Sequence, residues 1–180
     1  MNIDDIAGRA KGIILEPGKE WPRIKKEQKS NMDLLLHYAL PMIVLAALTS
    51  FIGSWSLHLV VYQLAMPLVS LVVSSYVINM LAGKFESTEN LNNAFKLVVY
   101  AATPSLLASI VANLSFLLGW VGLFGLYSIY LFWIGIPVMM DTPESRRLGY
   151  VLLSALVIMV VQMVIMAVMA PSWGWGLLAG

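Results

Sequence analysis

Few residues in this chain are of the types that carry metal or acid–base chemistry. It contains 2 histidines and no cysteine, which excludes thiolate metal sites, disulfides and cysteine nucleophiles. His37 and His58 lie near the ends of apolar segments and have no candidate partner close by in the sequence. We interpret both as hydrated or hydrogen-bonded residues at a membrane interface, and not as switches or ligands.

Methionines form a stripe at helical spacing towards the C-terminus: Met159, Met163, Met166 and Met169. Thioether sulfurs are soft ligands that bind Cu(I). Methionine is also an ordinary filler of apolar helices, and no cysteine or histidine accompanies the stripe. We therefore favour packing over metal binding, and we predict neither a metal site nor a cofactor.

The sequence also lacks motifs of catalysis. It has no HExxH, G-x-S-x-G or P-loop motif, each of which has a defined chemical role. Gly122 and Gly125 lie inside an apolar run, where a glycine loop would have no phosphate to cradle. We predict no catalytic residue and no enzyme activity. The formal net charge of +1 gives no general attraction to nucleic acid, so no nucleic-acid partner is expected.

The elements that carry these residues are apolar segments of membrane-spanning length. The chain is 59% hydrophobic and 12% charged, whereas soluble domains carry about 25% charged residues. Charges are confined to the ranges 1–33, 83–96 and 141–149. Between and after them lie apolar segments 34–52, 59–82 and 150–170, each close to the roughly 20 residues that span a bilayer as a helix.

A longer uncharged run, 97–140, requires a different interpretation. As one helix it would be about 66 Å long, which is twice the thickness of the hydrocarbon core. It must therefore fold back on itself. Gly119 and Gly122 flank Trp120 and predict a hairpin there, which gives spans 97–116 and 121–140.

Basic residues test this count of five spans. With five spans, all 11 Lys and Arg residues lie on one side of the membrane, which the positive-inside rule identifies as the cytoplasm. A four-span model would leave Arg146 and Arg147 outside. We predict an all-α membrane protein, a bundle of five transmembrane helices over 34–170, with a cytoplasmic N-terminus and an extracytoplasmic tail, 171–180. The predicted spans contain no Asp, Glu, Lys or Arg, which argues against a charge-coupled pump.

The N-terminal tail, 1–33, is amphipathic and basic. Apolar residues recur at helical spacing up to Ile14, so we expect a short amphipathic cytoplasmic helix that ends before Pro17. A cationic segment follows, with candidate lipid-surface residues Trp21, Arg23, Lys25, Lys26 and Lys29. Such a segment suits an anionic inner leaflet. The alternative is that these cations only orient the protein.

Polar amides and prolines are spread over the spans. Gln63, Asn79, Asn113 and Gln162 are expected to form hydrogen bonds between helices, with lining of a polar cavity as the alternative. Four spans contain a proline, at Pro41, Pro67, Pro104 and Pro137. Each proline removes a backbone donor and predicts a kink.

Spaced motifs along the chain resemble the Yip1 family of polytopic membrane proteins, particularly its short bacterial members. They are Arg9-Ala10-Lys11 with Ile13-Ile14, Pro17 and Trp21; Tyr100, Thr103 and Pro104; Leu126-Tyr127-x-x-Tyr130-Leu131; Gly135-Ile136-Pro137; and Met140, Thr142-Pro143 and Gly149-Tyr150. The resemblance implies a five-helix domain with a cytoplasmic N-terminus. The acidic D-L-Y-G-P motif of the eukaryotic, Rab-associated relatives is missing, so Rab binding is not expected.

The resemblance also suggests a shared functional surface and a function. Its projection onto this chain gives candidate binding residues Tyr100, Thr103, Pro104, Tyr127, Tyr130, Gly135 and Pro137. We expect a non-enzymatic, multi-pass protein of the bacterial inner membrane that organises lipids or membrane partner proteins, including copies of itself. The alternative is a transporter or channel for a small or lipid-like solute, with its pathway between the third and fourth spans.

Overall fold

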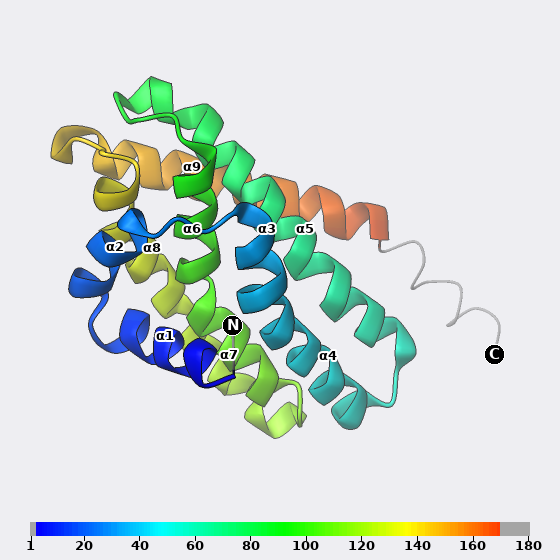
Figure 1. The fold of residues 1–180 in the computed structure, drawn as a ribbon. Helices are drawn as coiled ribbons and strands as arrows, with labels where there is room; N and C mark the ends of the chain where they lie inside the picture. The colour runs from blue at the N-terminus through cyan, green and yellow to red at the C-terminus, as the bar shows by residue number, and fades with distance from the viewer. Residues whose placement is uncertain (1–2, 170–180) are drawn as a thin grey trace.

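The computed structural model describes residues 3–169, which form helices and no strand (Figure 1). Five helical segments are long and apolar enough to cross a membrane, as predicted. The predicted C-terminal tail, 171–180, lies outside the described residues.

Each span is built from one to three helical elements. The first contains α3 (Asn31–Leu34), the π-helical turn η1 (Leu35–Ala39) and α4 (Leu40–Ser54); the second contains α5 (Leu57–Ala82) and η2 (Gly83–Phe85); the third contains α6 (Leu91–Ala101) and α7 (Thr103–Ala112); the fourth contains the 3-10 helix η3 (Phe116–Leu126) and α8 (Tyr127–Met139); the fifth is α9 (Glu144–Met169). The third span is the most buried of the five and contacts the first, second and fourth spans. It is therefore the centre of the bundle.

Prolines mark two of the joints between these elements. Pro41 has no backbone N–H to continue the α-helical ladder, and the N–H of Leu40 donates to the carbonyl of Leu35, five residues back. Pro104 lies in the first turn of α7, directly after the break at Ala102. Pro67 and Pro137 lie inside α5 and α8.

The turn between the third and fourth spans lies earlier than the predicted hairpin at Trp120. It occupies 113–115, and Gly119 and Gly122 lie inside η3. The Ser115 side chain begins η3 by accepting a hydrogen bond from the Leu117 N–H at 3.3 Å. Gly53 in α4 approaches this turn closely, because a Cβ there would lie 2.1 Å from the Asn113 carbonyl oxygen. The close approach of α4 to the turn therefore depends on a glycine.

The third span also begins earlier than predicted, at Leu91 and not at residue 97. Asn90 caps α6, since its side chain accepts a hydrogen bond from the Asn93 N–H at 3.0 Å. Lys96 therefore lies within the helix, where it is only 3% exposed. The prediction that the spans contain no Asp, Glu, Lys or Arg was therefore wrong for Lys96, and also for Asp33 at the start of the first span and Glu144, Arg146 and Arg147 at the start of the fifth.

The N-terminal segment forms two helices, α1 (Ile3–Leu15) and α2 (Pro17–Lys26), where one had been predicted. Both pack against the bundle, and α2 lies beside α8 (Figure 1). The side chains of Ile13, Trp21 and Ile24 are fully buried in the protein. The prediction that Trp21 is a lipid-surface residue was therefore wrong: its indole packs against Gly135.

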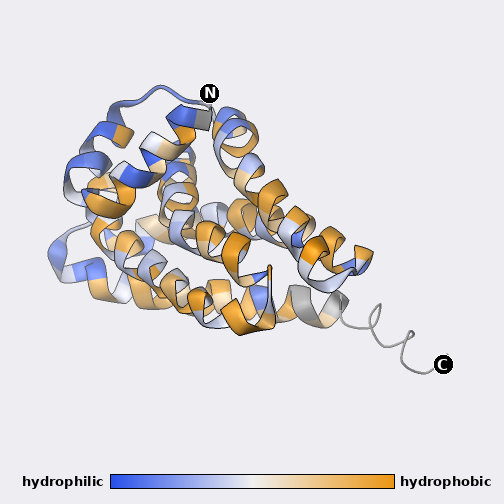
Figure 2. Ribbon diagram, turned by 90° about the horizontal axis from the view of Figure 1, so that it is seen from below, coloured by the Kyte–Doolittle hydropathy of each residue, from blue (hydrophilic) through white to orange (hydrophobic). Residues whose placement is uncertain are grey.

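The charged segments gather at one end of the bundle. Lys25 pairs with Asp141, Arg146 pairs with Glu86, and the Thr88 N–H donates to the Met140 carbonyl oxygen at 2.7 Å. These contacts join α2, the loop after α5 and the loop after α8. Figure 2 shows the hydrophilic residues on the N-terminal helices and adjoining loops at the left, whereas the helices that run to the right are mostly hydrophobic.

We predict that Gly135→Ala loosens the docking of α2. A Cβ at position 135 would lie 2.6 Å from the Trp21 ring and 2.7 Å from Leu97 Cδ1, and such overpacking costs about 1–3 kcal/mol. Thermal unfolding in detergent should show a lower midpoint, and proteases should cleave the N-terminal helices faster. Gly119→Ala is the matched control, because nothing lies within 4 Å of its added Cβ. Equal stability of the two variants would contradict this prediction.

Candidate functional site

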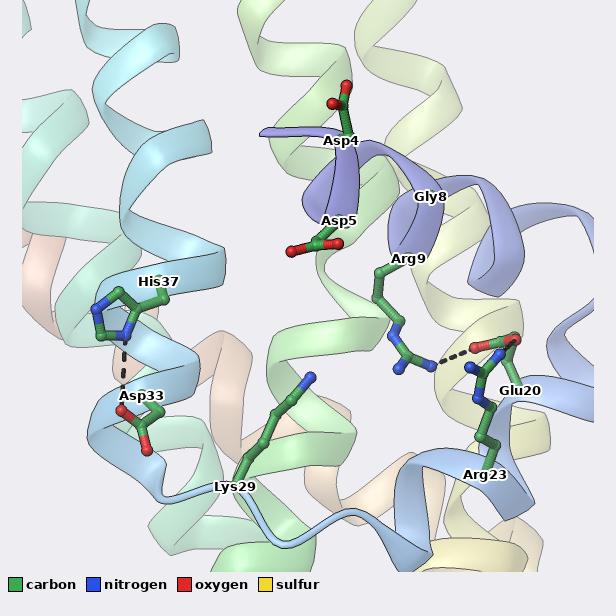
Figure 3. Close-up of a pocket in the computed structure, with 9 residues that line it drawn as sticks. All are labelled: Asp4, Asp5, Gly8, Arg9, Glu20, Arg23, Lys29, Asp33 and His37. Carbon is green, nitrogen blue, oxygen red and sulfur yellow. Dashed lines mark hydrogen bonds and ion pairs between the residues drawn. The ribbon is translucent and has the colours of Figure 1, made fainter. Parts of the chain in front are cut away.

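A polar cleft of about 830 Å³ lies between the N-terminal helices and the first span. Its lining comes from α1, α2, the loop before α3, and the first two turns of the span: Asp4, Asp5, Gly8, Arg9, Glu20, Arg23, Lys29, Asp33 and His37. In Figure 3 the side chains of Asp5, Arg9 and Lys29 point into the space between these elements. The cleft thus combines carboxylates and cations at the charged end of the bundle.

Arg9 is the central cation of the cleft wall. Its two terminal nitrogens pair with Glu20 and Glu27, and all three side chains are mostly buried. Burial acts to lower the pKa of Arg9, but the charges of Glu27, Tyr100 and Glu20 together outweigh it and raise the pKa above its ordinary value. The guanidinium therefore stays protonated and holds α1 against α2.

Lys96 supports the same pair of helices from inside the bundle. Its ammonium donates a 2.6 Å hydrogen bond to the carbonyl oxygen of Glu27, the C-cap residue of α2. A cation at this position is favourable, because the last carbonyls of a helix carry partial negative charge. Lys29 lies 3.0 Å from the Glu27 carboxylate. Glu27 is therefore the point where three cations meet.

Two tyrosines, Tyr38 and Tyr100, form a pair of rings beside Arg9. The Tyr38 and Tyr100 rings are 4.7 Å apart, and the Arg9 guanidinium lies 5.9 Å from the centre of the Tyr100 ring, within the range of a cation–π contact. The Tyr38 hydroxyl is 2.8 Å from Thr103 Oγ1. The Tyr100 hydroxyl is buried and has no hydrogen-bond partner among the described residues. Tyr38 comes from the π-helical turn before Pro41, and such turns are frequent at functional sites.

The candidate binding residues from the resemblance do not form one open pocket. Tyr100, Thr103, Pro104 and Gly135 are buried. Tyr127 donates a 2.9 Å hydrogen bond to the Ile14 carbonyl oxygen at the end of α1. Together, Tyr100, Tyr127 and Gly135 contact the N-terminal helices, so this part of the motif is a docking surface within the chain.

The other two candidates are more exposed, and the Tyr130 ring lies 5.2 Å from the Tyr127 ring of that docking surface. Tyr130 is 49% exposed, and Pro137 lies half-buried within α8. None of the seven candidate residues lines the polar cleft. The structure therefore separates these seven candidate residues from the cleft, which Arg9 of the Arg9-Ala10-Lys11 motif does line.

The four candidate lipid-surface cations also lie in different environments. Arg23 and Lys26 are exposed, Lys25 is paired with Asp141, and Lys29 lines the cleft. A lipid-surface role for these cations stays a prediction.

Sequence reasoning missed the residues that build the cleft wall. Glu20 and Glu27 had been considered only as parts of an amphipathic, basic tail, Arg9 only as part of that tail and of the Arg9-Ala10-Lys11 motif, and Lys96 had been placed beside a loop. The sequence did contain one sign that Lys96 lies in a helix. Asn90 is a good helix N-cap residue, and it precedes Lys96 by less than two turns.

Two of the four amide side chains in the spans form the hydrogen bonds between helices that the sequence predicts. Asn113 donates a 3.1 Å hydrogen bond to the Ala46 carbonyl oxygen, and Gln162 pairs with Ser70.

Within residues 3–169, no group of three or more His, Asp or Glu residues is arranged to hold a metal ion. The cleft is thus suited to binding a charged group through ion pairs and hydrogen bonds.

We expect Arg9→Met to destabilise the fold by about 3 kcal/mol, because removing one partner of a buried pair leaves the other charges uncompensated. Thermal unfolding in detergent measures this loss. Arg23→Met is the control: the Arg23 side chain is 70% exposed and lies 3.5 Å from Glu20, so its loss should change stability by at most about 0.5 kcal/mol. Adding Glu27→Gln to Arg9→Met should restore part of the loss. If the double variant lost as much stability as the two single variants together, the pairing of Arg9 with Glu27 would be contradicted.

Comparison with known proteins agrees with this architecture. The family model for the Yip1 domain matches residues 11–166. The chain is 26% identical to the inner membrane protein YohC of Escherichia coli strain K12, over 92% of this chain and 95% of that protein. The YohC protein of E. coli O6:H1 gives the same identity and coverage. No solved structure matches the chain. Since the family model covers most of the sequence, this five-span protein belongs to the Yip1 domain family.

Proposed function

We propose that this protein is a non-enzymatic membrane protein that organises lipids, and that the polar cleft binds the headgroup of a zwitterionic aminophospholipid. The observation that carries the proposal is the joint lining of one cleft by carboxylates and cations beside the start of a transmembrane span. A headgroup with a phosphate and an ammonium group needs both signs of charge close together.

The cleft has residues for each group. Arg23 and Lys29 would bind the phosphate in exchange for their pairs with Glu20 and Glu27, and Asp5 and Asp33 would bind the ammonium. Arg9 pairs with both Glu20 and Glu27 and holds the wall in place. The volume of about 830 Å³ lies within the roughly 300–1,000 Å³ of ordinary ligand sites.

The position of the cleft also favours a lipid. Asp33 and His37 lie in the first two turns of the first span, at the depth where headgroups meet helix ends. Met32 and Leu36 alternate with them along the chain and are 61% and 45% exposed. Apolar side chains next to a polar cleft suit a ligand whose head binds the protein while its chains stay in the bilayer.

We infer that this end of the bundle faces the cytoplasm, because the Lys and Arg residues fall on one side of a five-span topology. The similarity to inner membrane proteins supports the bacterial inner membrane as its location. The exposed Arg23 and Lys26 would then face an anionic leaflet. Binding of membrane partner proteins or a second copy of the chain remains part of the same proposal.

Transport of a small or lipid-like solute is the second candidate function. An uncharged cavity inside the bundle favours it, and part of that cavity lies between the third and fourth spans. A flux of solute across vesicles that contain the purified protein, absent from protein-free vesicles, would support transport over organisation.

A binding experiment tests the headgroup proposal. We expect short-chain phosphatidylethanolamine to bind the purified full-length protein more tightly than phosphatidylglycerol with the same chains, as measured by native mass spectrometry. The double variant Asp5→Asn/Asp33→Asn should weaken phosphatidylethanolamine binding about tenfold, since a charge-assisted hydrogen bond contributes about 1.5–3 kcal/mol. Arg23→Gln should weaken the binding of both lipids.

Lys84→Gln is the control, because Lys84 is an exposed cation at the end of α5 that does not line the cleft. It should bind both lipids as the wild type does. Equal binding of phosphatidylethanolamine by the Asp5→Asn/Asp33→Asn variant and the wild type would overturn the proposal.

A further inference from the structure

A second cavity, of about 460 Å³, lies between α5, the third span, α8 and α9. It opens to the surface of the bundle, since Ile129 in its lining is 60% exposed. Its lining contains no ionisable side chain: it is apolar, with serine hydroxyls and two glutamine amides. This chemistry is the opposite of that in the polar cleft. A ligand of this cavity must therefore be uncharged where it touches the protein.

The cavity is elongated along α5. Lining residues on this helix extend from Gln63 to Ile78, which corresponds to about 22 Å at 1.5 Å per residue. The end near Ile78 is lined by Val98 and Val151, whereas Gln63 and Gln162 belong to the other half. The cavity therefore has a hydrocarbon-like end towards the charged loops and a polar end deeper along the bundle.

Hydrogen bonds fix the walls of the cavity. Gln162 pairs with Ser70 and joins α9 to α5. Ser105 Oγ is 2.8 Å from Ser128 Oγ and joins the third span to α8. These polar groups are satisfied within the protein, so they shape the cavity without requiring a ligand.

Two other polar groups of the lining are not satisfied in this way. The Gln63 amide and the Ser74 hydroxyl make no hydrogen bond to any of the described residues. Ser74 is only 6% exposed, and an amide and a hydroxyl facing an apolar cavity are costly unless a partner is bound. The Gln63 amide, at the end of the cavity farther from Ile78, marks where a ligand would place its polar head.

We propose that this cavity binds a single-chain neutral lipid, whose hydroxyl or ester head meets Gln63 and whose hydrocarbon chain extends along α5 towards Ile78. The length of the cavity suits one extended chain, and its lack of charge excludes a phosphate or a carboxylate head. This site is separate from the polar cleft and does not depend on the headgroup proposal.

The test uses 1-monooleoylglycerol as the probe and oleate as its charged counterpart, with the purified full-length protein and native mass spectrometry. We expect saturable binding of one monooleoylglycerol and at least tenfold weaker binding of oleate. Ala155→Phe, which fills the cavity from α9, should weaken monooleoylglycerol binding at least tenfold. Ala167→Phe is the matched control, because Ala167 is an exposed residue of the same helix outside the cavity lining.

A milder variant covers the case in which Ala155→Phe does not fold. Gln63→Leu removes the amide and keeps a side chain of similar size, so it should weaken monooleoylglycerol binding about fivefold and leave thermal stability unchanged. Asp5→Asn/Asp33→Asn should leave monooleoylglycerol binding unchanged, which separates this proposal from the headgroup proposal. Non-saturable uptake, equal binding of oleate, or wild-type affinity in a folded Ala155→Phe or Gln63→Leu variant would overturn it.

Discussion

Burial of charge at the junction of the N-terminal helices and the third span is the constraint on which the rest of the structure depends. Lys96 lies inside the most buried span, and Arg9 lies over the Tyr100 ring of the same span. A buried charge is tolerated only when it is paired and hydrogen-bonded. Glu20 and Glu27 supply that pairing, and both come from the N-terminal segment. The N-terminal helices are thus required by the bundle and are not an independent tail.

Apolar packing works together with this charge pairing. Trp21 fits over Gly135, where no side chain larger than hydrogen can be placed without displacing the ring. The hydrogen bond from Tyr127 to the Ile14 carbonyl oxygen fixes the end of α1. Directional contacts of this kind matter in membranes, because burial of apolar surface from lipid provides little driving force. The docked helices then form one wall of the polar cleft, and the first span forms the other.

The two cavities differ in the chemistry that they offer. The cleft between α1, α2 and the first span has charges of both signs and is open to polar groups. The cavity between α5, the third span, α8 and α9 has no ionisable lining. The cleft therefore suits the charged head of a lipid, and the cavity between the spans suits an uncharged chain. This arrangement fits a role in organising lipids better than one based on moving charged solutes.

The sequence by itself determined the fold class, the number of spans and the gathering of charge at one end. These follow from local quantities: the length of apolar runs and the positions of Lys and Arg. It also determined that α1 ends before Pro17, because proline restricts its own backbone and that of the residue before it. The tertiary structure decided what the N-terminal segment contacts, where the turn after the third span lies, and which residues form the cleft. Burial of Trp21 and Lys96 depends on partners more than 60 residues away, and no periodicity within a segment encodes such partners. An amphipathic pattern predicts an apolar face, but only the assembled bundle decides whether lipid or protein covers it.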